Sequence, residues 1–269
     1  MRTLLPAFAL LAAFALPAGA QQIELEKLVQ APGIVPLGEG IKVGYRYERL
    51  TTVQGKETRE WLAVVGETKD AWEVETNQIL VHMAQSMPDA KGAVFALVVD
   101  KKTHKVLLAK LGKPGAALKE ARVMQMQLPK QAEEQKPARS EDLSIGEESV
   151  PADVYVTEAE GVGKMTTYVG KKGSALEGIL LKFEGPQSYE LKGLPSETPF
   201  ELEDEVDGEK VKVAARRAEY TNGQVMTSCK HPVAKAFQVQ NMLQFSTAAV
   251  KMKIVSLRTD AKRTLNWGE

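Results

Sequence analysis

The chain has one cysteine, three histidines and no excess of either charge, and each scarcity excludes a class of protein. A single cysteine, Cys229, excludes an intramolecular disulfide, so stability must come from a packed core rather than from the cross-links of small secreted domains. The 35 basic residues balance the 35 acidic ones. Because nucleic acid and anionic membranes attract clustered Lys and Arg, we expect neither as a partner.

The sequence also lacks the short motifs that identify many enzymes. No G-x-S-x-G, P-loop, H-E-x-x-H or G-x-G-x-x-G pattern occurs. Asp and Glu pairs are scattered, and their separation in space cannot be read from the sequence. The sequence therefore predicts no catalytic residue, no metal ligand and no cofactor, and it identifies no binding residue.

The first twenty residues have the order of a secretory signal peptide. Arg2 supplies the positive charge, residues 4–16 are apolar apart from Pro6, and Ala18-Gly19-Ala20 is an A-x-A cleavage site. Gln21 takes the place of the cysteine that lipid modification requires. No later segment is apolar enough to span a bilayer. We expect residues 1–20 to be removed, and the remaining 269 − 20 = 249 residues to be periplasmic or secreted.

Alternation of apolar and polar residues is the dominant pattern in the rest of the chain. It is clear in residues 41–47 and 250–254, while residues 93–99 are apolar throughout, as in a strand that is covered on both faces. Helix signals are few, with one short helix expected at residues 24–30. The pattern predicts a mostly β protein of antiparallel curved sheets, half-barrel or sandwich-like, with few short helices.

Turn signals separate these runs. The clearest are Gln54-Gly55, Gly112–Gly115, Asp207-Gly208 and Asn222-Gly223. Asp-Gly and Asn-Gly tolerate the positive φ of a tight hairpin. We therefore expect residues 200–206 and 210–214 to pair as a hairpin around Asp207-Gly208.

A polar, charged stretch divides the chain. Residues 129–145 are predicted to be a linker or long loop between an N-terminal β-rich half, residues 21–128, and a C-terminal β-rich half, residues 146–269. Whether the two halves are separate domains or one continuous sheet system stays open at this point.

Several short segments resemble a group of uncharacterised exported bacterial β-rich proteins. They are Trp61–Trp72, Gly112–Gly115, Ser149–Ala152, Gly178–Glu184 and Tyr189–Leu191. The sequence departs from that group at Asp153, where the group usually has Gly, and the resemblance brings no catalytic residue. More distantly, the architecture and the compartment are similar to lipoprotein-carrier-like half-barrels, whose curved sheets hold acyl chains. That similarity implies binding of an apolar ligand.

Cys229 and His231 are the first candidates for chemistry. On a strand they share a face, which suits a metal or a Cys–His nucleophile. His82 and His104 are distant in the sequence, however, and zinc needs three or four ligands. The favoured interpretation is a buried thiol beside a solvent-facing histidine.

The acidic stretch 197–209 and the large apolar side chains are the other candidates. An EF-hand frame on Glu203, Glu205, Asp207 and Gly208 places Ala214 where a bidentate Glu is required, so a solvated hairpin is favoured. Large apolar residues are either pocket lining or plain core, and core is favoured; they are Trp61, Trp72, Met124, Met126, Met226, Met242 and Met252.

These observations favour a non-catalytic envelope protein that binds an apolar ligand or a protein partner. The alternatives are a hydrolase-type enzyme whose site is assembled from distant residues, and a structural module of the envelope. An apolar groove under the sheet favours the first, convergent carboxylates or histidines favour the second, and a filled core favours the third.

Overall fold

The computed structural model describes residues 25, 29–84, 86–124, 136–159 and 163–267. The structure is 54% strand and 6% helix, which confirms the mostly β class with large antiparallel sheets. The expected signal peptide, residues 1–20, lies outside the described residues. So does most of the short helix expected at residues 24–30, of which Leu25 is helical and Gln30 already belongs to a strand. In the described ranges, no helix has both the length and the apolar character needed to cross a membrane.

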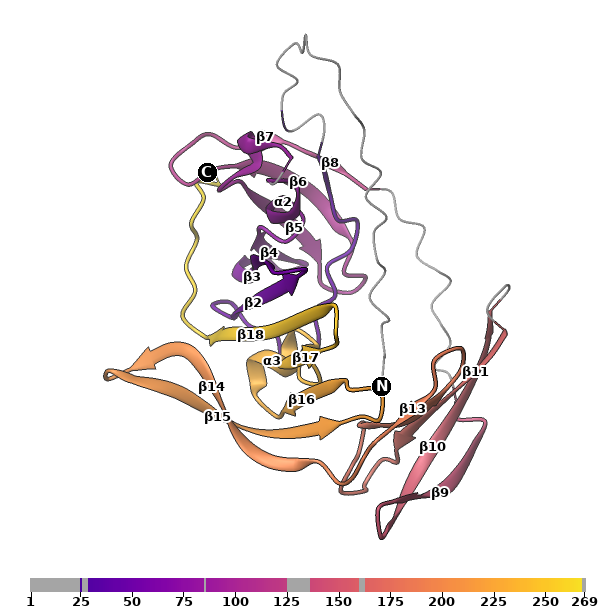
Figure 1. The fold of residues 1–269 in the computed structure, drawn as a ribbon. Helices are drawn as coiled ribbons and strands as arrows, with labels where there is room; N and C mark the ends of the chain where they lie inside the picture. Colours follow the sequence, from indigo (N-terminus) through magenta and orange to yellow (C-terminus); the bar gives the residue numbers. More distant parts are fainter. Residues whose placement is uncertain (1–24, 26–28, 85, 125–135, 160–162, 268–269) are drawn as a thin grey trace.

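The main sheet has eleven antiparallel strands in the order β14-β15-β16-β17-β18-β2-β3-β4-β5-β6-β7 (Figure 1). In chain order they are β2 (Arg46–Val53), β3 (Lys56–Glu67), β4 (Ala71–Thr76), β5 (Val94–Asp100), β6 (Val106–Gly112), β7 (Lys119–Glu120), β14 (Ser196–Val206), β15 (Glu209–Glu219), β16 (Val225–Cys229), β17 (Gln244–Ser246) and β18 (Val250–Arg258).

A second, five-stranded antiparallel sheet has the order β13-β12-β11-β10-β9. Its strands are β9 (Arg139–Ile145), β10 (Glu148–Ala159), β11 (Gly163–Gly170), β12 (Leu180–Glu184) and β13 (Tyr189–Glu190). Two short strands, β1 (Gln30–Ala31) and β8 (Arg122–Val123), pair in parallel. After residue 29, the helices in the described ranges are α2 (Leu80–Met83), the 3-10 turn η1 (Pro88–Ala90) and α3 (Pro232–Ala236).

The predicted linker between the two halves is wrong at its C-terminal end. Residues 139–145, expected within the linker, form β9 and pair with β10. This strand lies at an edge and buries mainly Ile145, so its polar composition does not prevent pairing. The relation of the two halves, which the sequence left open, is settled by β18, which pairs with β2 so that strands from both halves form one continuous sheet.

One hairpin prediction is confirmed, and one strand prediction is wrong about where the strand begins. The hairpin around Asp207-Gly208 is confirmed, with positive φ angles of 55° and 83° at its two turn residues. The strand expected at residues 41–47 begins only at Arg46. At Gly44 the backbone has φ of 92°, and a Cβ there would lie 2.4 Å from the carbonyl oxygen of Thr259, so the chain turns closely against the C-terminal segment.

The inner face of the main sheet packs on the largest core. Alternate residues of β3 and β5, among them Val64 and Phe95, share one core with buried residues of the segment before β2 and of helix α3. Phe237, at the end of α3, packs on Tyr47 with ring centroids 5.0 Å apart. The sheet therefore covers its own short helices and its N-terminal segment on one face.

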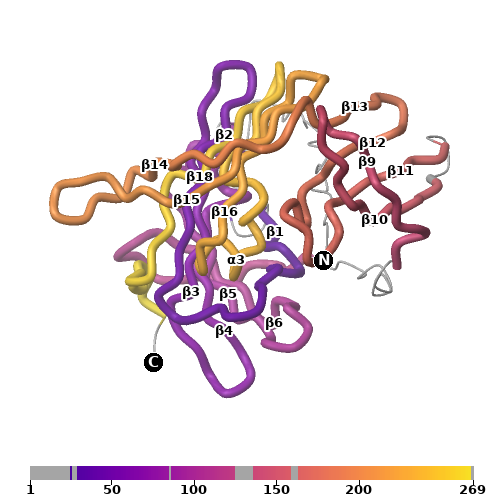
Figure 2. The backbone as a smooth tube through the Cα atoms, turned by 90° about the horizontal axis from the view of Figure 1, so that it is seen from below, coloured from indigo at the N-terminus to yellow at the C-terminus, as the bar shows by residue number. Residues whose placement is uncertain are grey.

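The far end of the main sheet curls back toward its middle. The β14–β15 hairpin is long and reaches away from the five-stranded sheet to a free tip (Figures 1 and 2). Along it, the carboxylate of Asp204 accepts hydrogen bonds from the Ser256 hydroxyl at 2.8 Å and from the Leu257 amide at 2.9 Å. Since β14 and β18 are not neighbours in the strand order, these bonds fix the curvature of the sheet.

The outer face of β3–β5 is covered by the C-terminal residues 259–267. Glu75 on β4 is fully buried there and accepts hydrogen bonds from the amides of Thr264 and Leu265 and from the Trp267 indole at 2.9 Å. Leu265 packs with Val94 in a small separate core. One buried carboxylate therefore fastens the C-terminal segment to the sheet.

The five-stranded sheet packs on one end of β15 and β16. Its core includes Ala218 of β15 and Tyr220, which directly follows that strand. The Tyr220 hydroxyl donates a hydrogen bond to the carbonyl of Leu180 at 2.9 Å, and burial raises the pKa of this phenol well above its ordinary value. The two sheets therefore share a packed contact.

Candidate functional site

A small apolar cavity lies on the inner face of the main sheet. It has a volume of about 70 Å³. Its roof is the cover segment, residues 32–36, and its floor comes from β3, β4 and β5. Seven of the nine lining residues are apolar: Pro32, Ile34, Val35, Pro36, Leu62, Ile79 and Phe95, with Thr76 and Gln78 as the two polar ones.

Both polar side chains of the lining already have partners. The Thr76 hydroxyl donates to the carbonyl of Trp61 at 2.7 Å, and the Gln78 amide donates to the Tyr47 hydroxyl. Asn77, between them, accepts from the Trp61 amide at 2.7 Å and so fixes the turn into α2. With these two bonds made, the cavity offers an entering molecule mainly apolar contacts.

A charged cluster of Arg49, Glu60 and His82 lies on the same face of the sheet. Arg49 and Glu60 are directly opposite in the β2–β3 register, and Arg49 Nε lies 3.1 Å from Glu60 Oε2. His82, on α2, binds the other carboxylate oxygen. Glu60 is 3% exposed. The cluster therefore ties α2 to the sheet through one buried carboxylate.

The electrostatics of the cluster keep Glu60 ionised. Burial raises its pKa, but the hydrogen bonds and charges of His82 and Arg49 outweigh burial and leave the pKa below its ordinary value. A general acid or base needs a free oxygen and a pKa near the working pH. Both oxygens of Glu60 are occupied, so the arrangement is suited to holding α2 rather than to proton transfer.

The structure brings Cys229 and His231 together, with no third ligand among the residues it describes. The His231 amide donates to the Cys229 sulfur at 3.4 Å. Burial raises the pKa of the thiol and lowers the pKa of the imidazole, so neither group is activated. His231 is half-buried rather than solvent-facing. Within the described residues, no group of three or more His, Cys, Asp or Glu side chains is arranged to hold a metal ion.

The burial of Cys229 gives a direct prediction. The thiol residue is 8% exposed, so we expect a bulky thiol reagent to label the native protein far more slowly than the unfolded protein. Cys229→Ser should lower the free energy of unfolding by about 1 kcal/mol, the ordinary cost of a small core change. Rapid native labelling, followed by mass spectrometry, would contradict this.

Those of the remaining sequence candidates that the structure describes do not form a site. Glu203 and Glu205 are exposed on β14, and Glu203 pairs with Arg59 of β3. Trp61 packs with the core on the outer face, whereas Trp72 packs with the inner core, so the two rings line no common pocket. Among the methionines, Met124 is 40% exposed, Met226 packs against the core of the five-stranded sheet, and Met126 lies outside the described residues.

Sequence reasoning missed the residues that surround the cavity. The cover segment Pro32-Gly-Ile-Val-Pro36 is a short apolar run between two prolines, and that composition was the available signal for an extended covering strand. No local sequence pattern marks Gln78 and Ile79 as cavity residues, because their place on the inner face depends on the turn after β4.

Comparisons with protein-family models, with curated proteins and with solved structures found no match.

Proposed function

We propose that this protein is an exported, non-catalytic binding protein that holds an apolar group, such as part of an alkyl chain, on the inner face of its main sheet. The observation that carries this proposal is the apolar cavity beneath the cover segment. Export is supported by the sequence of residues 1–20, with its positive start, apolar run and A-x-A site.

The size of the cavity limits what enters it. An engineered apolar cavity of about 150 Å³ binds benzene, and this one has about half that volume. It therefore accepts the end of an alkyl chain, and a longer stretch requires the cover segment to move.

The cover segment is suited to such a movement. Pro32 and Pro36 have no N–H group to donate. The segment is held to the turn before β6 by two backbone bonds, from the Val35 amide to His104 and from the Val106 amide to Gly33, both 3.0 Å. Lifting the segment therefore breaks few hydrogen bonds.

The experiment is calorimetric titration of the mature protein with octanoate and dodecanoate. We expect saturable binding with a negative heat-capacity change, the sign of apolar burial. Ile79→Trp, which puts a large ring at the cavity wall, should weaken binding at least about tenfold by overpacking the space. The matched control is Leu107→Trp on β6, where the native side chain is 62% exposed and outside the cavity.

The variants must first keep the native melting temperature and circular dichroism spectrum. If neither acid binds, or if both tryptophan variants bind alike, the apolar-ligand proposal fails. A structural module of the envelope is then favoured, because the inner face would be a filled core and nothing more.

A further inference from the structure

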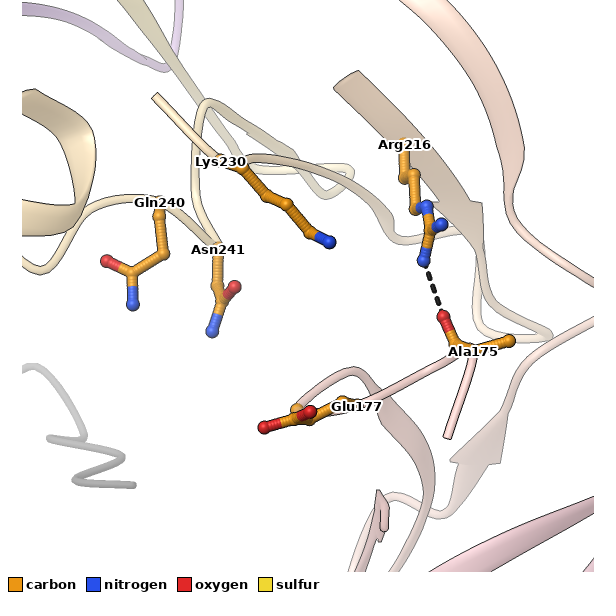
Figure 3. A pocket seen from close by; sticks show the side chains of 7 residues that line it. Ala175, Glu177, Arg216, Lys230, Gln240 and Asn241 are labelled. Atoms are coloured by element: carbon orange, nitrogen blue, oxygen red, sulfur yellow. Dashed lines mark hydrogen bonds between the residues drawn. The ribbon is translucent and has the colours of Figure 1, made fainter. Parts of the chain in front are cut away.

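A second, polar pocket lies where the two sheets meet. It has a volume of about 300 Å³, at the lower end of the range for small-molecule sites. One wall is the loop between β11 and β12, and the other comes from β15, the end of β16 and the turn before β17. Figure 3 shows Lys230 and Asn241 pointing into the space between these walls, with Glu177 across from them.

The loop wall is held firmly in place. The Gly178 amide donates to the carbonyl of Gly170 at 2.9 Å, and a Cβ at Gly170 would lie 1.9 Å from the Leu176 carbonyl oxygen. Arg216 on β15 crosses the gap and donates to the carbonyl of Ala175 at 2.5 Å (Figure 3). The walls are therefore joined by a hydrogen bond, and the pocket has a defined shape.

The charges on the two walls are opposite. Lys230 forms no ion pair with any residue in the described ranges, so its ammonium group is open to an anion. Glu177 accepts one hydrogen bond, from the Gly173 amide at 3.0 Å, which leaves an oxygen for another donor. At the side of the pocket, Gln240 Oε1 is buried and has no partner among the described residues.

We propose that this pocket binds a small zwitterion that carries both a carboxylate and an ammonium group, such as an amino acid or a short peptide. Lys230, with the Asn241 amide, holds the carboxylate, and Glu177 holds the ammonium group. Charge-assisted hydrogen bonds of this kind are stronger than neutral ones. Since the ligand contacts both walls, its binding also stabilises the contact between the two sheets.

The test uses three forms of one dipeptide in nitrogen-15 NMR titrations of the mature protein. Alanyl-alanine has both charges, its N-acetyl form has only the carboxylate, and its C-terminal amide has only the ammonium group. We expect saturable shifts at Gly178, Lys230 and Asn241 with alanyl-alanine, and binding at least about tenfold weaker for each capped form, as loss of one charge-assisted bond implies.

Variants locate the site independently of the capped ligands. Lys230→Met and Glu177→Gln should each weaken alanyl-alanine binding at least about tenfold. Lys235→Met, at an exposed lysine of α3 outside the pocket, is the matched control and should bind as the wild type does. Absence of binding, equal binding of all three dipeptide forms, or equal binding of the Lys230 and Lys235 variants would each overturn the proposal. None of these outcomes depends on the apolar cavity.

Discussion

Glu75→Ala is expected to lower the free energy of unfolding by about 3–5 kcal/mol, because it leaves several buried hydrogen-bond donors without an acceptor. The carboxylate is completely buried and accepts from two amides, the Thr264 hydroxyl and the Trp267 indole. Its removal leaves these donors without a partner beneath the C-terminal segment. Chemical denaturation of the variant and the wild type measures the difference.

The control is Glu73→Ala, two residues earlier on the same strand face. Glu73 is 18% exposed and pairs with the exposed Arg263, so its loss should cost no more than about 1 kcal/mol. If the two variants are equally stable, Glu75 does not fasten the C-terminal segment in the way its hydrogen bonds indicate.

The second large effect is acid sensitivity that depends on Glu60. Its pKa is lower in the folded protein than its ordinary value of 4.5. A lowered folded-state pKa contributes stability that is present above pH 4.5 and is lost as the pH falls through the folded-state pKa. The free energy of unfolding should therefore decline below about pH 4.5.

Glu60→Gln separates this effect from the general effect of acid. The amide cannot ionise, so its bonds to Arg49 and His82 are weaker, and we expect the free energy of unfolding at pH 7 to be about 2 kcal/mol lower. We also expect this free energy to fall less than that of the wild type as the pH decreases. Glu205→Gln, at an exposed position of β14, is the control and should keep the wild-type pH profile. If the Glu60 variant loses stability with falling pH as steeply as the wild type does, the acid sensitivity does not come from Glu60.

Local patterns predicted one hairpin and several strands of this fold. Alternation in residues 250–254 became β18, and the apolar run at residues 93–99 became β5, buried on both faces. The Asp207-Gly208 turn formed because both residues accept positive φ. These features depend on neighbours in the sequence, so the sequence contains enough information to predict them.

Long-range pairing could not be predicted in the same way. The contact of β18 with β2 joins residues about 200 positions apart, and no local pattern specifies which strands meet. The strand β9 was missed because its residues are mostly polar, and an edge strand tolerates polar and charged side chains on its exposed face.

The Arg49–Glu60 pair of the charged cluster could have been predicted from the sequence. A two-residue turn at Gln54-Gly55 pairs Val53 with Lys56, and this register places Arg49 opposite Glu60. His82 joins the pair through α2, and the cavity depends on the path of the cover segment. Both of these depend on tertiary contacts, which is why the sequence alone identified no binding residue.

The most direct measurement of apolar binding is the set of nuclear Overhauser effects between octanoate labelled at its terminal methyl group and the methyl groups of the mature protein. The proposal predicts contacts to Ile34, Val35 and Ile79, which line the cavity. Contacts only to the exposed Leu107 and Leu108 of β6, or no contacts at all, would contradict it.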